Sequence, residues 1–276
     1  MATVYLNAAT GNDANTYAQA QNSATPWLTL GKVQTSANTG DTVNLTAGTY
    51  TWADITFTKS FTWIGAATVN GMPSTIINGA AANVRWLFGG ITSSFSRMWF
   101  KNIINTSLNT GSFESNAINN NTSFVNCVFS DIALTNLANY VLFREYMIGT
   151  NTVTFTGCLF YNIGLAGTGI ARLLTTNNTT VSFINCTIYN SIINAGWTYN
   201  SIGGAGVGTF KNCIIYHDTS VVLTAYGGTL SYSCVYPMTL PAGTGNLAAD
   251  CLFVDKANNN FNLRSTSPCI DMGTLA

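Results

Sequence analysis

The stretch Phe124-Val-Asn-Cys127-Val-Phe129 places an aromatic residue three positions before a cysteine that apolar residues follow. The same order returns as Phe155-Thr-Gly-Cys158-Leu-Phe160, Phe183-Ile-Asn-Cys186-Thr-Ile188 and Phe210-Lys-Asn-Cys213-Ile-Ile215. Weaker copies lie around Ile76, Ile103 and Cys234, and the intervals between equivalent positions are 27, 24, 31, 28, 27 and 21 residues. A unit that recurs at this length indicates a solenoid, in which each repeat stacks on its neighbours.

Each repeat contains short runs of β-branched and aromatic residues, such as Val153–Phe155 and Val181–Ile184. Clusters rich in Asn, Gly, Ser and Thr separate these runs, as in Thr175–Thr180. This is the chemistry of strands and turns, and no stretch has the period of a long amphipathic helix. Three short strands and their turns fit one coil of about 26 residues, so we predict an all-β parallel β-helix. A β-sandwich with a fortuitous recurrence of Phe and Asn is the alternative.

Stacked coils place equivalent residues one above another, about 4.8 Å apart. We therefore expect an internal ladder of cysteines beside a ladder of phenylalanines: Cys127, Cys158, Cys186 and Cys213, with Phe124, Phe155, Phe183 and Phe210. The asparagine before the cysteine, as in Asn126, Asn185 and Asn212, should lie outside a strand or at a bend.

Composition excludes several classes of function. Lys and Arg number 10, Asp and Glu number 10, and the formal net charge is zero. Such a surface has no basic patch for nucleic acid, and no apolar run reaches the roughly 18 residues of a membrane helix. Met1–Asn7 leads directly into a predicted strand, so we expect no secretion signal. We predict neither nucleic acid nor a membrane as a partner.

The seven cysteines recur at the period of the repeat and have no paired-bridge spacing. Burial as small apolar side chains is the simplest interpretation. The chain has one histidine, His217, and no Cys-x-x-Cys pair, so we expect no metal site and no cofactor.

Both ends of the chain resemble a known family. The segments that carry the resemblance are Val4–Asn7, Gly11–Asp13, Thr25–Leu30, Gly40–Leu45 and Ala47–Tyr50 near the start, and Asn262–Gly273 near the end. They are similar to the opening and closing motifs of the pectate-lyase-like superfamily. That resemblance implies a single-stranded right-handed parallel β-helix, closest in character to β-helix proteins of phage virions and tailspikes. The superfamily contains lyases, glycosidases and non-catalytic proteins, so the resemblance implies a fold more than a function.

We expect one domain over residues 1–276. Residues 1–50 would form an N-terminal cap and the first strand, residues 51–250 the coils, and residues 251–276 a closing segment. The apolar spacing of Trp27, Leu28, Leu30 and Val33 predicts a short helix that begins at Thr25-Pro26 and covers the open end of the first coil.

The candidate site residues are few. Counted back from the cysteines, Glu114 and Glu145 occupy equivalent positions, as do Arg144 and Arg172, so each pair should stack in adjacent coils. Two stacked carboxylates would have the separation of a retaining glycosidase, and the arginines could bind an acidic sugar. A surface ladder of ion pairs is the structural alternative. Trp197 and Tyr199 are further candidate contacts for glycans or partner subunits.

The main functional hypothesis from the sequence is a non-catalytic structural virion protein of phage type, such as a capsid decoration or tail appendage, with glycan binding as an added role. It predicts synthesis in the host cytoplasm and a place on the virion surface. Its expected partners are other virion proteins or the other copies of the chain in a homotrimer. The alternative is a polysaccharide lyase or glycoside hydrolase acting on an acidic or capsular polysaccharide. A third hypothesis, ice binding, rests on Thr152–Thr156 and Thr56–Thr58, and the unequal repeat intervals argue against the regular array it needs.

Overall fold

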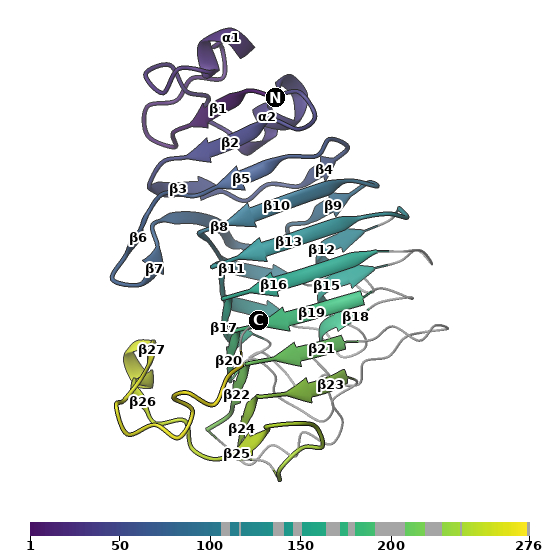
Figure 1. The fold of residues 1–276 in the computed structure, drawn as a ribbon. Coiled ribbons are helices and arrows are strands. Elements are labelled where there is room, and N and C mark those ends of the chain that lie inside the picture. The colour runs from purple at the N-terminus through teal and green to yellow at the C-terminus, as the bar shows by residue number, and fades with distance from the viewer. Residues whose placement is uncertain are drawn as a thin grey trace.

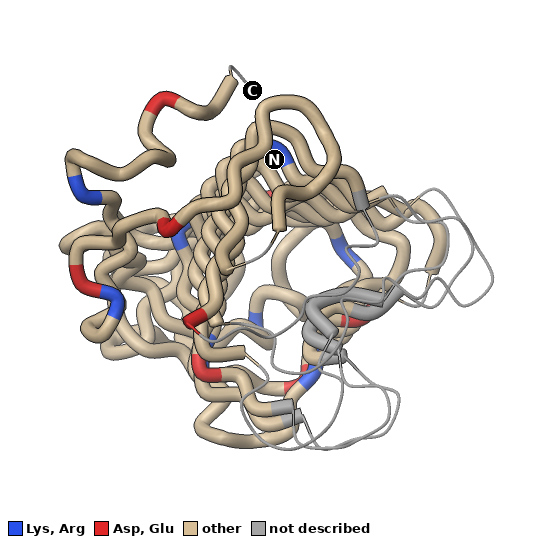
Figure 2. Tube along the Cα trace, turned by 90° about the horizontal axis from the view of Figure 1, so that it is seen from below, with Lys and Arg blue, Asp and Glu red and all other residues tan. Residues whose placement is uncertain are grey.

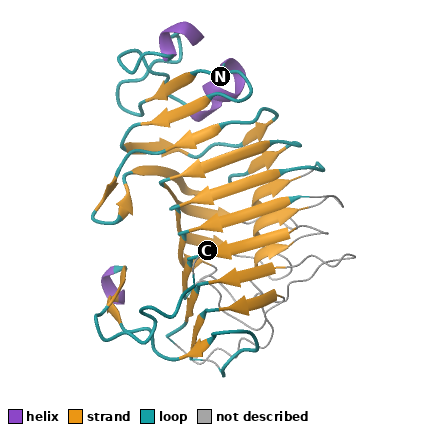
Figure 3. Ribbon diagram, in the orientation of Figure 1, coloured by secondary structure: helices purple, strands orange, loops and turns teal. Residues whose placement is uncertain are grey.

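A computed structural model describes residues 1–105, 111–115, 117–134, 141–145, 151–163, 172–175, 180–190, 208–218, 228–237 and 239–274. In these residues the chain is an all-β parallel solenoid (Figures 1 and 3). Its strands stack into three sheets, and each sheet extends along the axis of the solenoid. Strands that lie far apart in sequence become neighbours because successive coils add their strands to the same sheets. The β-sandwich alternative is therefore wrong.

The three sheets are named A, B and C. Sheet A contains β1 (Thr3–Leu6), β2 (Thr42–Leu45), β5 (Thr62–Ile64), β10 (Thr92–Ser96), β13 (Asn121–Val125), β16 (Thr152–Thr156), β19 (Thr180–Ile184), β21 (Gly208–Lys211) and β23 (Gly228–Ser231). Sheet B contains β3 (Gly48–Thr51), β8 (Thr75–Ala82), β11 (Met98–Asn105), β14 (Val128–Leu134), β17 (Leu159–Ile163), β20 (Thr187–Tyr189), β22 (Ile214–Tyr216), β24 (Cys234–Tyr236) and β25 (Leu247–Ala248). Sheet C contains β4 (Ile55–Phe57), β9 (Trp86–Phe88), β12 (Gly111–Ser115), β15 (Val141–Glu145) and β18 (Arg172–Thr175).

The corner between sheet A and sheet B explains the recurring motif. Asn126, Asn185 and Asn212 have φ angles of 52°, 54° and 56°, and Gly157 occupies the same place in its coil with φ 63°. Asn and Gly are the residues that enter this left-handed region most readily, so each can turn the chain sharply after a strand of sheet A. The asparagines thus lie at a bend, and the following cysteine points into the coil.

The interior is a stack of rings. Phe124, Phe155, Phe183 and Phe210 pair in register across sheet A, and successive ring centroids lie 5.3, 4.8 and 4.7 Å apart in stacked orientation. Phe129 and Phe160 from sheet B meet these rings edge-on. Aromatic pairs in such geometry add about 0.5–1.5 kcal/mol each beyond the area that they bury.

Two short helices lie near the N-terminus. Helix α1 (Tyr17–Ala20) contacts β1, and helix α2 (Leu30–Ser36) contacts β4 (Figure 1). The residue that caps α2 is Thr29, whose side chain accepts from the Lys32 amide, so the predicted start at Thr25-Pro26 is wrong. Asp13 explains the later start, because its carboxylate accepts hydrogen bonds from the Leu28 and Thr29 amides and holds that segment extended.

Two hairpins project from the coil. One joins β6 (Thr68–Val69) to β7 (Met72–Pro73), and the other joins β26 (Phe253–Asp255) to β27 (Asn260–Leu263) through the 3₁₀ turn η1 (Lys256–Asn258). The second hairpin packs on the outer face of sheet B (Figure 1). No helix in the described parts of the chain is long and apolar enough to cross a membrane.

Candidate functional site

A single column of hydroxyl side chains runs along the outer face of sheet A. Strand pairing puts one serine or threonine in the same place on each of the nine described strands: Thr3, Thr42, Thr62, Ser94, Ser123, Thr154, Ser182, Thr209 and Thr229. All nine are exposed or half-buried, whereas the residue that follows each of them on its strand is buried in the core. Neighbouring hydroxyls are therefore separated by the distance between adjacent strands, about 4.8 Å.

A second polar column flanks the first in the middle of the sheet. Thr92, Asn121, Thr152 and Thr180 pair in register, two residues before the hydroxyl column on each strand. The Thr152 hydroxyl donates to Asn121 Oδ1 at 2.6 Å. The two columns form the hydroxyl face, a name that we use for these thirteen side chains.

The hydroxyl face is hollowed where its two columns meet. A shallow groove of about 180 Å³ is lined by Phe61, Thr62, Thr92, Ser93, Ser94, Asn121, Thr122, Ser123, Thr152 and Thr154. Its polar lining is made of hydroxyl and amide groups, which can both donate and accept hydrogen bonds.

The hydroxyl face is nearly free of charge. Within the described strands of sheet A, Lys211 is the one charged residue. Viewed along the axis, charged residues are few and scattered around the described coil (Figure 2). Such a surface favours an uncharged partner, since it has no field that would attract or orient an ion.

Unequal repeat intervals do not disturb the hydroxyl face. From β10 to β24 the residue of sheet A and its counterpart in sheet B are five positions apart, as in Phe124 and Phe129 or Phe155 and Phe160. In these coils the differences in interval fall in the return from sheet B to sheet A. The coil before β10 is longer between the two sheets because it contains the hairpin β6–β7, yet its strands still pair in register. Our sequence argument against a regular hydroxyl array is therefore wrong, because it assumed that irregular length means irregular register.

The structure does not stack the candidate acids and arginines as the intervals predicted. Glu114 pairs in register with Arg144, Glu145 pairs with Ser115, and Arg172 pairs with Val141. Counting back from the cysteines fails here because it crosses the return of variable length. The prediction that Glu114 lies on Glu145 and Arg144 on Arg172 is wrong.

Glu114 is a buried ion-pair partner. Its side chain is 1% exposed, and its carboxylate accepts a hydrogen bond from the guanidinium of Arg85 at 3.1 Å. The side chains of Arg144, Glu145 and Arg172 lie outside the described part of the structure, as do residues Trp197 and Tyr199. Among described residues the candidate set thus contributes one buried, charge-paired acid.

The four motif cysteines fill the corner between sheets A and B. Each is 1% exposed, and each thiol donates to the carbonyl of the ladder phenylalanine one coil earlier; for Cys158 this acceptor is Phe124, at 3.4 Å. Burial raises the pKa of the Cys158 and Cys213 thiols. The burial of all four cysteines makes them packing residues.

His217 and Asp218 do not form an acid–base pair. His217 is 1% exposed, its Nε2 has no hydrogen-bond partner among the described residues, and burial lowers its pKa to about 4. Asp218 instead accepts from Lys256, Tyr189 and Asn190. Burial would raise the pKa of Asp218, but these three donors hold it below its usual value.

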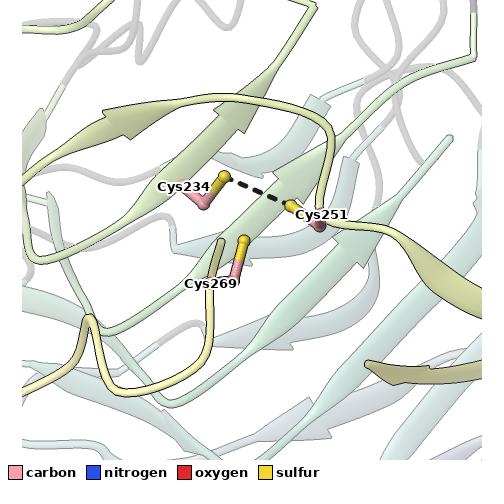
Figure 4. A group of neighbouring side chains, drawn as sticks. All are labelled: Cys234, Cys251 and Cys269. Atoms are coloured by element: carbon pink, nitrogen blue, oxygen red, sulfur yellow. Dashed lines mark hydrogen bonds between the residues drawn. The ribbon is translucent and has the colours of Figure 1, made fainter. Parts of the chain in front are cut away.

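Sequence spacing did not reveal two features. The hydroxyl column can be found in the sequence, because a serine or threonine precedes each ladder phenylalanine, as in Ser123-Phe124 and Thr154-Phe155. The other feature is a cluster of three thiols, Cys234, Cys251 and Cys269, whose long spacing resembles no metal motif (Figure 4).

The chain resembles known proteins in its structure but not in its sequence. No protein-family model and no curated protein sequence matches the chain. Among solved structures it is similar to a rhamnogalacturonan lyase, with a TM-score of 0.47 and 15% identity over 90% of this chain and 67% of that one. It is also similar to pectate lyase Pel9A, with a TM-score of 0.39 and 12% identity over 100% and 92%. For a pectin methylesterase from Aspergillus niger the TM-score is 0.36 and the identity 10%, over 94% and 93%. We base no conclusion about activity on similarities of this size.

Proposed function

We propose that the protein binds an uncharged, extended polysaccharide along the hydroxyl face of sheet A. The supporting observation is the unbroken column of nine hydroxyl residues, with a second polar column beside it. Each hydroxyl can donate and accept, so the face can match a polymer that repeats alcohol groups along its length. The scarcity of charge on sheet A favours a neutral sugar polymer over the acidic one that we expected from Arg144 and Arg172.

Binding without cleavage is the form of this proposal that the described residues support. Glycosidases of the usual kind need two carboxyl groups that flank the scissile bond. Glu114 is buried against Arg85, and the groove of the hydroxyl face has no acid in its lining. A lyase or glycosidase remains the alternative, with Glu145 as its candidate acid.

Affinity electrophoresis against a panel of soluble neutral and acidic polysaccharides tests the proposal. We expect retardation by a neutral polymer, weakened at least about tenfold, or about 1.4 kcal/mol, by Thr154→Arg in the middle of the face. The matched control is Thr56→Arg, an exposed threonine on β4 of sheet C, which should leave binding unchanged.

Two results would overturn the proposal. The first is equal binding by both variants, which would move the site away from the hydroxyl face. The second is release of reducing or unsaturated ends from any polysaccharide of the panel, together with loss of that release in Glu145→Gln, which would favour the enzymatic alternative.

Ice is a second candidate ligand, and the regular spacing of the hydroxyl residues, six of the nine in the column being threonine, favours it. Threonine presents a methyl and a hydroxyl together, and a flat array with repeats of about 4.8 Å across strands and about 6.6 Å along them can order water. Thermal hysteresis and faceting of ice crystals would be the measurement. If both were present in wild type, absent in Thr154→Arg, and no sugar polymer bound, ice binding would replace polysaccharide binding.

We also propose a right-handed coil, a covering role for α2 and a place on a virion surface. A right-handed coil is supported by the strong preference of parallel crossovers for that hand, and a lid role for α2 by the burial of Leu30 and Val33. A virion surface, with further copies of the chain or other virion proteins as partners, is checked by mass spectrometry of purified particles.

A further inference from the structure

Three cysteines from distant parts of the sequence meet at the C-terminal end of the solenoid. Cys234 begins β24, Cys251 follows β25, and Cys269 lies in the closing segment after β27. Their side chains point toward one another (Figure 4). All three sulfurs lie within 4.8 Å of one another. The four motif cysteines, in contrast, form a ladder along the axis.

The distances suit one ion among three sulfurs. The sulfurs of Cys251 and Cys234 are 3.2 Å apart, and the widest separation within the cluster is below 4.8 Å. Two sulfurs bound tetrahedrally to one Zn²⁺, each at about 2.3 Å, lie about 3.8 Å apart. The observed range brackets that value, so small side-chain movements would bring the three sulfurs into position.

The cluster is buried on one side and open to a cavity on the other. Cys251 is fully buried and Cys234 is 5% exposed, whereas Cys269 is partly exposed. Cys234 and Cys269 line a cavity of about 240 Å³, which gives an ion a path to the cluster and leaves room for a water as fourth ligand.

Two hydrogen bonds of the Ser267 hydroxyl hold Cys251 and Cys269 in place. The Ser267 hydroxyl donates to the Cys251 carbonyl at 2.6 Å and accepts from the Cys269 amide at 3.2 Å. A thiolate is the form that binds metal.

We propose that Cys234, Cys251 and Cys269 bind one Zn²⁺ ion as three thiolates, with solvent from the adjoining cavity as the fourth ligand. Each thiol loses its proton to solvent when the ion binds, and the affinity therefore falls as the pH is lowered. Soft sulfur ligands select Zn²⁺ over the harder Mg²⁺ and Ca²⁺. The ion would tie the closing segment to β24 of sheet B and so hold the C-terminal hairpin in place.

The test uses the full chain, purified under reducing conditions and freed of metal by chelation. Zn²⁺ is titrated in competition with a chromophoric chelator, and Co²⁺ is then substituted as a spectroscopic probe. We expect one Zn²⁺ per chain and the intense near-ultraviolet absorption of sulfur-to-cobalt charge transfer. Zn²⁺ should also slow proteolysis of the closing segment.

Two serine variants make the test specific. Cys269→Ser, a change at the most exposed of the three thiols, should weaken Zn²⁺ binding more than about 100-fold, beyond the loss for an outer-shell partner. Cys158→Ser removes a buried ladder thiol that lies outside both the cluster and the lining of its cavity, and this variant should bind Zn²⁺ like the wild type.

Three outcomes would overturn the proposal. One is less than one equivalent of bound Zn²⁺ in a folded, reduced wild type. Another is equal loss in both serine variants, which would reflect misfolding or dispersed thiols. The third is a Cys234–Cys251 disulfide in the freshly isolated protein with no Zn²⁺ uptake after reduction, which would make the cluster a redox pair.

Discussion

The outer faces of sheets A and B are both built from parallel strands, but one is exposed to solvent and the other is covered. On sheet A the outward column is serine and threonine, and it faces solvent along the described strands. On sheet B the corresponding column is Tyr161, Tyr189, Tyr216 and Tyr236, which pair in register on successive strands. The hairpin β26–β27 lies over that column, with Phe253 and Phe261 against the tyrosine rings.

The comparison shows that one column of side chains decides whether a face of the solenoid is covered. A tyrosine ladder left in water would expose a continuous apolar patch. The hairpin removes that patch, and polar partners satisfy the ring hydroxyls: Tyr189 donates to Asp218, and Lys256 donates to Tyr216. A hydroxyl ladder has no such need and can remain open for a ligand.

Loss of the cover should have the largest effect. Phe253 is 5% exposed, with its ring centroid 5.2 Å from Tyr216 and 5.5 Å from Phe261. We expect Phe253→Ala to lower the free energy of unfolding by about 3–5 kcal/mol, because it leaves a cavity under the hairpin. Urea unfolding followed by tyrosine fluorescence measures the change, and a loss below about 1 kcal/mol would mean that the hairpin only rests on sheet B.

Acidification should have the next largest effect, through His217 at the end of β22. Burial lowers its pKa from 6.5 to about 4, so the folded state binds this proton less readily than the unfolded chain. The stability that neutral His217 contributes is present above pH 6.5 and is lost as the pH falls toward 4. This loss is about 3 kcal/mol, at 1.36 kcal/mol for each pKa unit.

His217→Gln is the matched variant for that measurement. Urea unfolding between pH 7 and pH 4 should show a smaller decrease in stability than in the wild type. Equal decreases in both proteins would assign the pH dependence to other groups.

A smaller effect is expected at the ion pair between Asp218, which follows β22, and Lys256 in the hairpin turn η1. The pKa of Asp218 is held below its usual value, so its contribution is present above about pH 4 and disappears as the pH falls through the folded-state pKa. Both side chains are one third or more exposed, and Asp218→Asn should therefore cost less than about 1 kcal/mol at pH 7. The difference from wild type should vanish near pH 2, and high salt should reduce it.

The smallest effect is expected on the open face. Thr154→Ala removes one hydroxyl and one methyl from the surface of β16, and stability should change by no more than about 0.5 kcal/mol. Thermal unfolding of Thr154→Ala beside Phe253→Ala tests the contrast directly. A large loss at Thr154 would show that sheet A has a structural cover too.

The sequence predicts the fold well where the chain length is constant. Phe124 and Cys127 and their equivalents define the corner between sheets A and B, where the coils from β10 to β24 have the same number of residues. The pairing of Glu114 with Arg144 could not be predicted, because the return to sheet A differs in length from coil to coil. The meeting of Cys234, Cys251 and Cys269 depends on how the closing segment folds back, and local pattern carries no information about that.

The fixed corner at Asn126, Gly157, Asn185 and Asn212 has a consequence for how such a protein can change. From β10 to β24 the number of residues from sheet A to sheet B is constant, so segments inserted on the return side would leave this corner unchanged. Evolution could lengthen or exchange segments there without moving the hydroxyl face relative to the sheet that carries the tyrosines. Sheets A and B would thus stay fixed relative to each other while the return side of the coil changes in length.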